Sequence, residues 1–161
     1  MKYAKVRDVK SPERGTGKSA GIDFFVPNDF DAILYPHKDI LIPSGIIVEI
    51  PENCMLMAAD KSGVVTSKHA IKSNGLIPKN EAFDGSIIIG AKIIDEDYQG
   101  EIHIHLINTS NYPVRILPGR KIAQFIIVPI IYEDFEQVPK GRLFTRASER
   151  GAGAFGSTGT R

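Results

Sequence analysis

The chain has 161 residues, of which 42% are hydrophobic and 24% charged, and this composition excludes a disordered, collagen-like or membrane-spanning protein. Twenty basic residues against nineteen acidic ones leave a formal charge of +1, without the broad positive charge that binds nucleic acid polymers. The single Cys54 fits a reducing compartment, and no secretory signal is visible. We therefore expect a cytoplasmic protein, in the host cytoplasm if the chain is viral.

Short apolar runs that end at proline or glycine recur along the chain, and they are typical of half-buried β-strands. The runs lie at residues 22–26, 40–42, 46–50, 87–94, 102–106 and 122–131. Only residues 62–73 could form a short helix, and residues 74–86 resemble a long loop. The pattern predicts one all-β domain, a distorted β-barrel or jelly roll of many short strands over residues 1–149. The Gly-rich residues 150–161 are too poor in apolar side chains to fold alone, so we expect a flexible arm.

His103 and His105 lie two residues apart on a predicted strand, so their side chains point to the same face. Metal ligands on β-barrels share this spacing, but no carboxylate follows His105 within residues 106–110 to complete such a site. A strand face directed to solvent or to an interface is the favoured interpretation.

An acidic turn follows the apolar run at 87–94, with three acids at 95–97, Tyr98 and a closing Gly100. An acid at the inner end of a strand can be partly desolvated and can act as a general base. A solvated acidic turn is the simpler interpretation of these residues alone.

The glycine-rich residues 150–159 combine Arg150, two hydroxyls, exposed backbone amides and Phe155. These groups suit an anion that carries a flat ring, because the guanidinium and amides can bind phosphate oxygens and the phenyl ring can stack. A disordered tail is the alternative interpretation.

Five segments in this order resemble the trimeric deoxyuridine triphosphatase (dUTPase) family across nearly the whole chain. They are residues 19–24, 60–63, 94–100, 118–124 and 150–159. The resemblance implies a magnesium-dependent hydrolase that cleaves dUTP to dUMP and pyrophosphate, lowering dUTP and supplying dUMP for dTMP synthesis. It also implies a homotrimer with active sites shared between subunits. A dCTP deaminase of the same broad fold and a nucleotide-sensing regulatory module remain alternatives.

The resemblance also implies a role for individual residues. Asp95 would be the general base for water attack on the α-phosphate, and Asp23 would support metal-bound waters. Mg²⁺ would be held mainly by substrate phosphates and water, with no direct protein ligand. The implied substrate-binding residues are Lys61, Ser62, Gly63, Gly90, Ile94, Tyr98, Gln124, Arg150, Phe155, Gly156, Ser157 and Thr158.

Within this set, the hairpin from Gly90 to Asp95 would read uracil through its backbone, and Tyr98 would pack under the deoxyribose. Phe155 would stack on the base once the arm closes. Two positions depart from the family pattern: Lys61 stands where arginine is usual, and Lys92 stands where many members have glycine. A positive φ at Lys92 would strain the backbone, whereas any other conformation lets its side chain point away.

Overall fold

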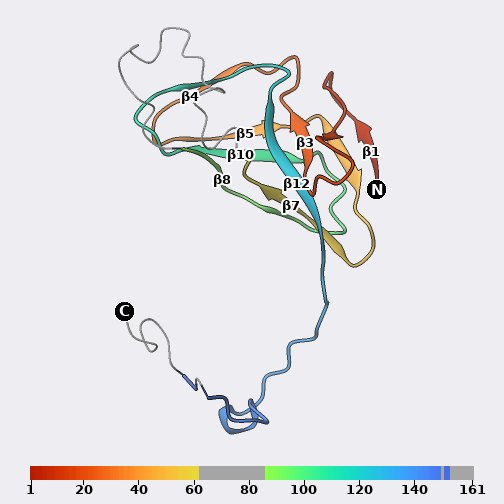
Figure 1. The fold of residues 1–161 in the computed structure, drawn as a ribbon, viewed down its shortest axis with the longest axis vertical. Helices are drawn as coiled ribbons and strands as arrows, with labels where there is room; N and C mark the ends of the chain where they lie inside the picture. Colours follow the sequence, from red (N-terminus) through yellow and green to blue (C-terminus); the bar gives the residue numbers. More distant parts are fainter. Residues whose placement is uncertain (62–85, 150, 153–161) are drawn as a thin grey trace. The chain divides into compact units, whose positions relative to one another are not determined.

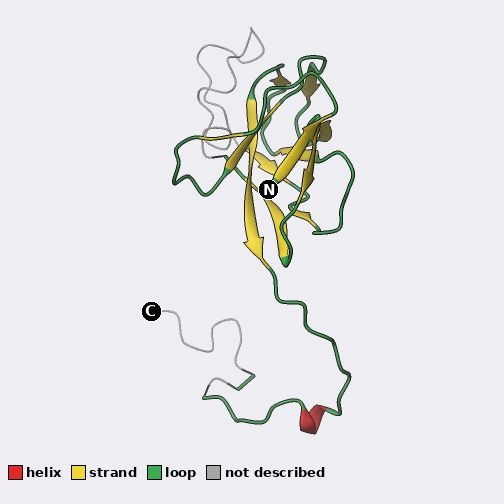
Figure 2. Ribbon diagram, turned by 90° about the vertical axis from the view of Figure 1, so that its right-hand side faces the viewer, coloured by secondary structure: helices red, strands yellow, loops and turns green. Residues whose placement is uncertain are grey.

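The computed structural model describes residues 1–61, 86–149 and 151–152, and it divides the chain into two units, residues 1–131 and 132–161 (Figures 1 and 2). The described strands all lie in the first unit. They are β1 (Lys2–Lys5), β2 (Glu13–Arg14), β3 (Ile22–Phe25), β4 (Ala32–Leu34), β5 (Asp39–Pro43), β6 (Ile46–Glu49), β7 (Cys54–Ala59), β8 (Ile87–Ile89), β9 (Ile93–Ile94), β10 (His103–Asn108), β11 (Val114–Ile116) and β12 (Lys121–Pro129). The all-β prediction is confirmed, while the helix considered at 62–73 and most of the loop at 74–86 lie outside the described residues.

Every described strand pairing is antiparallel, and the largest sheet has the order β2-β3-β12-β7-β9. A second sheet has the order β5-β10-β8, and the pairs β1-β6 and β11-β4 complete the unit. β12 therefore runs between β3 and β7. This order brings the first, second and fourth of the five segments to neighbouring strands.

The core forms where the alternating faces of these strands meet. On β10, Ile104, Leu106 and Asn108 are buried while the residues between them are less so, which is the period of two expected for a half-buried strand. Phe24 and Phe125 pack at the centre with their ring centroids 4.4 Å apart and their planes tilted by 50°. Such an aromatic pair contributes about 0.5–1.5 kcal/mol beyond its buried area. Cys54 is half-buried against this core.

The second unit contains one short 3-10 helix, η1 (Lys140–Arg142), within its described residues. Three of its apolar side chains are exposed: Phe135 fully, and Leu143 and Phe144 largely. The expected boundary between a domain at 1–149 and an arm at 150–161 stays a prediction. Across the described residues, no helix is long and apolar enough to cross a membrane.

Candidate active site

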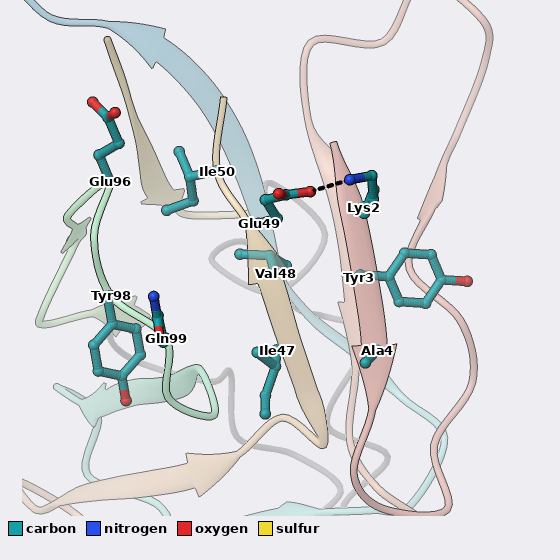
Figure 3. A pocket seen from close by; sticks show the side chains of 10 residues that line it. All are labelled: Lys2, Tyr3, Ala4, Ile47, Val48, Glu49, Ile50, Glu96, Tyr98 and Gln99. Atoms are coloured by element: carbon teal, nitrogen blue, oxygen red, sulfur yellow. Dashed lines mark ion pairs between the residues drawn. The ribbon is translucent and has the colours of Figure 1, made fainter. Parts of the chain in front are cut away.

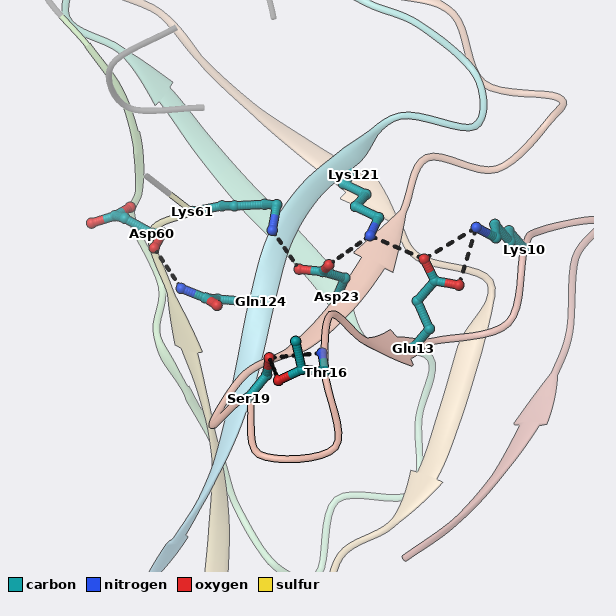
Figure 4. Close-up of polar contacts among 9 residues, drawn as sticks. All are labelled: Lys10, Glu13, Thr16, Ser19, Asp23, Asp60, Lys61, Lys121 and Gln124. Atoms are coloured by element: carbon teal, nitrogen blue, oxygen red, sulfur yellow. Dashed lines mark hydrogen bonds and ion pairs between the residues drawn. The ribbon is translucent and has the colours of Figure 1, made fainter. Parts of the chain in front are cut away.

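A buried carboxylate lies between two lysines where β3, β12 and the end of β7 meet (Figure 4). Asp23 on β3 is only 4% exposed. Its Oδ1 accepts a hydrogen bond from Lys61 Nζ at 2.8 Å, and its Oδ2 accepts one from Lys121 Nζ at 2.9 Å. Lys121 Nζ also lies 3.0 Å from Glu13, so the charges form a connected network. The network fixes Lys61 directly after β7, at the start of the second segment.

Burial raises the pKa of Asp23, but hydrogen bonds and charges from Lys61 and Lys121 outweigh burial and hold the pKa below its ordinary value of 3.8. A carboxyl group whose pKa is lowered by folding stabilises the protein above its unfolded pKa, near 3.9. That contribution is lost as the pH falls through the lower value of the folded state. The pH window of the loss therefore lies below about pH 4.

Replacing Asp23 with asparagine should lower the free energy of unfolding at pH 7 by about 1–3 kcal/mol, because the two ammonium groups lose their charged acceptor. At pH 3 the difference between the variant and the wild type should shrink. Urea unfolding at both pH values measures it, with Glu52→Gln as the control for an exposed carboxylate. A difference that is the same at pH 3 and pH 7 would contradict the proposed ionisation.

Gln124 on β12 pairs with Asp23 in the strand register and lies beside Lys61 (Figure 4). Its Nε2 donates a hydrogen bond to the backbone oxygen of Asp60 at 3.0 Å. Gly21 makes room for this amide, because a Cβ there would lie 2.2 Å from Gln124 Oε1. The glycine of the first segment and the glutamine of the fourth are therefore complementary in shape, and the structure brings Asp23, Lys61 and Gln124 together.

The expected hairpin at residues 90–95 and the strand before it contact the same end of β7, although β8 itself pairs with β10 and β9 pairs with β7. Asp60 Oδ1 accepts a hydrogen bond from Ile89 N at 2.6 Å, and Ala58 N donates to Lys92 O at 2.7 Å. Among the described residues, the non-glycine positions with positive φ are His37 and Asn53, so Lys92 carries no such strain. Its Nζ lies 3.6 Å from Asp60 Oδ2. The lysine thus fits the hairpin and adds a contact to the second segment.

The acidic turn begins with an exposed Asp95 directly after β9. Tyr98 N donates to Asp95 O at 3.2 Å, and Tyr98 Oη donates to Glu101 O at 2.9 Å. A Cβ on Gly100 would lie 2.4 Å from Tyr98 Oη, so the glycine leaves space for the ring. The turn therefore holds the tyrosine ring in place and leaves the Asp95 carboxylate open to solvent.

A cavity of about 400 Å³ lies beside Tyr98, between the turn and the strands β1 and β6 (Figure 3). Its ionisable lining residues include Lys2, Glu49 and Glu96, and Lys2 pairs with Glu49 at 2.8 Å. Two acids against one base do not favour a triphosphate. Around Lys61, by contrast, two ammonium groups, Lys61 and Lys121, stand against two carboxylates, Asp23 and Glu13, so each negative charge is matched by a positive one.

Asp95 and the Lys61 cluster lie at different places along β7. Ile94 pairs with Leu56, whereas Asp60 lies four residues further along the chain, just past the end of β7. At about 3.3 Å per residue, this separation is roughly 13 Å. Within one chain, the expected base and the expected phosphate-binding groups therefore form two separate parts of a site.

Sequence reasoning named only some of the residues in these two parts. The described residues include the expected Asp23, Lys61, Gly90, Ile94, Asp95, Tyr98 and Gln124. Ser62, Gly63, Arg150, Phe155, Gly156, Ser157 and Thr158 lie outside them. Lys121, Glu13 and Asp60 were missed as site residues, although Lys121 and Asp60 belong to quoted segments. The functional role of each residue stays a prediction.

Comparisons with known proteins point to one family. A family model described as dUTPase matches residues 74–159. The chain is 34% identical to a deoxyuridine 5'-triphosphate nucleotidohydrolase of Wolbachia sp. subsp. Brugia malayi (strain TRS), over 98% of this chain and 90% of the relative.

Solved structures agree. A dUTPase of Staphylococcus bacteriophage 80alpha, solved with dUPNHPP, is similar with a TM-score of 0.76 and 25% identity, covering 99% of this chain and 98% of that one. A dUTPase from phage phi11 of S. aureus, whose structure describes the coordination of a structural Mg(II) ion, has a TM-score of 0.67 at 22% identity, covering 86% of this chain and 96% of that one. At 22% identity, the similarity to the second structure supports the fold alone.

Proposed function

The chain belongs to the dUTPase family, and on this premise we propose that it hydrolyses dUTP to dUMP and pyrophosphate. The observation that carries the proposal is the meeting of Asp23, Lys61 and Gln124, from the first, second and fourth segments, beside the hairpin of the third. Relatives named as nucleotidohydrolases favour hydrolysis over deamination. The reaction would lower dUTP and supply dUMP for dTMP synthesis. A cytoplasmic location stays a prediction.

The phosphate chain would bind at Lys61 and Gln124. Lys61 Nζ donates one hydrogen bond to Asp23, and its side chain is 28% exposed. Its other two N–H groups can therefore donate to phosphate oxygens. Gln124 Nε2 donates one hydrogen bond to Asp60 O, and its second N–H can donate to an α-phosphate oxygen. Lysine acts as a point charge, so Lys61 would attract phosphate without the two-pronged geometry of arginine.

Asp95 would act as the general base. Its exposed carboxylate can accept a proton from a water molecule whose oxygen then attacks the α-phosphorus. The bond from this phosphorus to the bridging oxygen breaks, and pyrophosphate leaves. A base of this kind contributes about 10²- to 10⁴-fold, so positioning and charge neutralisation must supply the rest.

Magnesium fits these residues as an ion carried by the substrate. Mg²⁺ keeps several waters and is usually held by one or two carboxylates together with substrate phosphates. In the described ranges no three His, Cys, Asp or Glu side chains converge on one point, and both oxygens of Asp23 already accept hydrogen bonds from lysines. We therefore assign Asp95 and Asp23 at most to waters of the ion, whose chemistry is to neutralise phosphate charge.

The site would be completed by other subunits of a homotrimer. Two observations support this: the separation of Asp95 from the Lys61 cluster along β7, and the exposed phenyl rings of Phe135 and Phe144. A neighbouring subunit would cover these two rings, which are exposed in the single chain. The arm at 150–161, with Arg150 and Phe155, would close on the nucleotide from a third chain.

A panel of nucleotides with Mg²⁺, assayed for pyrophosphate release, tests the proposed function. We expect kcat/KM for dUTP to exceed that for dCTP, dTTP and UTP by at least about 10²-fold. Cytosine would present the wrong donors and acceptors to the hairpin backbone, the methyl group of thymine would find no room, and Tyr98 would exclude the 2′-hydroxyl of UTP. Equal turnover of dCTP and dUTP would contradict base selection. Equal turnover of UTP would contradict the role of Tyr98 against the ribose.

A further inference from the structure

His105 connects the hairpin at residues 90–95 to Asp39 on β5, at the opposite edge of the β5-β10-β8 sheet from β8. The residue lies on β10, between β5 and β8, and its side chain is 24% exposed. Nδ1 accepts a hydrogen bond from Ala91 N at 3.1 Å, and Nε2 lies 3.0 Å from Asp39 Oδ2. The backbone adds a further contact, from Gly90 N to His105 O at 2.9 Å. The sequence predicted a strand face directed to solvent or an interface, and within this chain the imidazole also has hydrogen-bond partners on both sides.

These contacts define where the imidazole proton lies. Because Ala91 N–H donates to Nδ1, that nitrogen carries no proton, and a neutral ring must carry its proton on Nε2. Nε2–H then donates to the Asp39 carboxylate. The carboxylate therefore holds the ring in the tautomer that can accept from Ala91.

Gly90 is shaped to receive this ring. A Cβ at position 90 would lie 2.3 Å from His105 Nδ1 and 2.6 Å from Cε1. The backbone of Gly90 does not have a positive φ, so conformational freedom does not explain the glycine. The space for the imidazole does.

We propose that His105 is a positioning residue that sets the base selectivity of the hairpin from Gly90 to Asp95; this inference rests on the proposed function and on the expectation that the backbone of this hairpin reads uracil. The pairing of β9 with β7 and the hydrogen bond from Ala58 N to Lys92 O hold the end of the hairpin that leads into β9. His105 anchors the Gly90–Ala91 end through its backbone and its ring. The orientation of the peptide between Gly90 and Ala91 determines which backbone donors and acceptors face a base. The imidazole ring therefore influences base recognition without contacting the nucleotide.

Three variants separate this role from ordinary strand stability. His105→Leu keeps the bulk of the ring and removes the acceptor, while His105→Asn can offer its amide oxygen where Nδ1 was. His103→Leu is the matched control, because His103 lies two residues earlier on the same face and its Nδ1 contacts Glu101 O, near its own strand end. Steady-state kinetics with dUTP and dCTP, and binding of dUMP by calorimetry, are measured for each.

We expect His105→Leu to raise KM for dUTP and Kd for dUMP about tenfold, the effect of one lost hydrogen bond, and to reduce the preference for dUTP over dCTP by a similar factor. The value of kcat should stay within about threefold, because no group at the phosphates changes. His105→Asn should recover most of the loss, and His103→Leu should match the wild type. An unchanged KM and preference in His105→Leu, or equal shifts in His103→Leu, would overturn the proposal.

Failure of the proposed function would look different. In that case the wild-type protein itself would not release pyrophosphate from dUTP. The positioning contact can still be tested by imidazole ¹⁵N spectroscopy, which should show Nδ1 unprotonated and Nε2 protonated, and by slowed exchange of the Ala91 amide that is lost in His105→Leu. A protonated Nδ1 would overturn the contact whatever the activity.

Discussion

Replacing Asp95 with asparagine is expected to lower kcat for dUTP at least about 10²-fold, because the amide has the shape of the carboxylate but cannot take a proton from water. KM should change little, since Lys61, Gln124 and the hairpin carry the binding contacts. Single-turnover pyrophosphate release measures the chemical step, and calorimetry with dUTP and Mg²⁺ measures binding to the slow variant.

Asp97→Asn is the matched control for this prediction. Asp97 lies on the same turn, is exposed like Asp95, and carries the same charge two residues further along. Its replacement should leave kcat within about threefold, so an effect of net charge on the turn can be separated from loss of the base. Near-normal turnover by Asp95→Asn would mean that another group activates the water. Equal losses in both variants would indicate an electrostatic role for the whole turn.

The fold was predictable where local patterns dominate. The apolar runs that end at proline correspond to β3, β5 and β6, and period-two alternation marks β10. The apolar run at 87–94 is divided into β8 and β9, because residues 90–92 turn to bond with His105 and Ala58. No local pattern encodes those partners.

Strands without an apolar pattern escaped prediction. β1 is exposed at all four residues, and β2 has only two, so neither shows the alternation that identifies a half-buried strand. Their positions depend on partners distant in the sequence. β1 pairs with β6 and β2 pairs with β3, and both are edge contacts rather than parts of the core.

The candidate site was predictable as a set of residues and not as a network. Asp23 and Gln124 belong to quoted segments, but the ion pair between Asp23 and Lys121 joins positions 98 residues apart. Lys121 was quoted only as part of its segment, because nothing in its neighbours shows that it shares the Asp23 carboxylate with Lys61. Charge balance around a buried group emerges only once the strand order is known.

A shared active site predicts that two inactive proteins restore activity when they are assembled together. One is Asp95→Asn with an intact arm, and the other is a chain that ends at Glu149 with an intact Asp95. The shortened chain should melt like the full protein, since residues 150–161 cannot bury enough apolar surface to contribute a core, but it should lose most activity. Refolding an equal mixture should return about a quarter of the wild-type activity per site, because half of the chains supply Asp95 and half supply an arm.

Two controls contain no arm at all. One is the shortened chain refolded alone, and the other is the shortened chain refolded together with a shortened Asp95→Asn chain. Light scattering must show trimers, and differently tagged chains must co-purify, so that mixing is established before activity is read. If Asp95 and the arm of each site came from the same chain, no mixed trimer would contain a complete site. Absence of recovery from trimers shown to be mixed, or a monomer in solution, would therefore contradict a shared site. Recovery of about one quarter of the activity would show that Asp95 and the arm of one site come from different chains, because each variant lacks a group that only the other variant can supply.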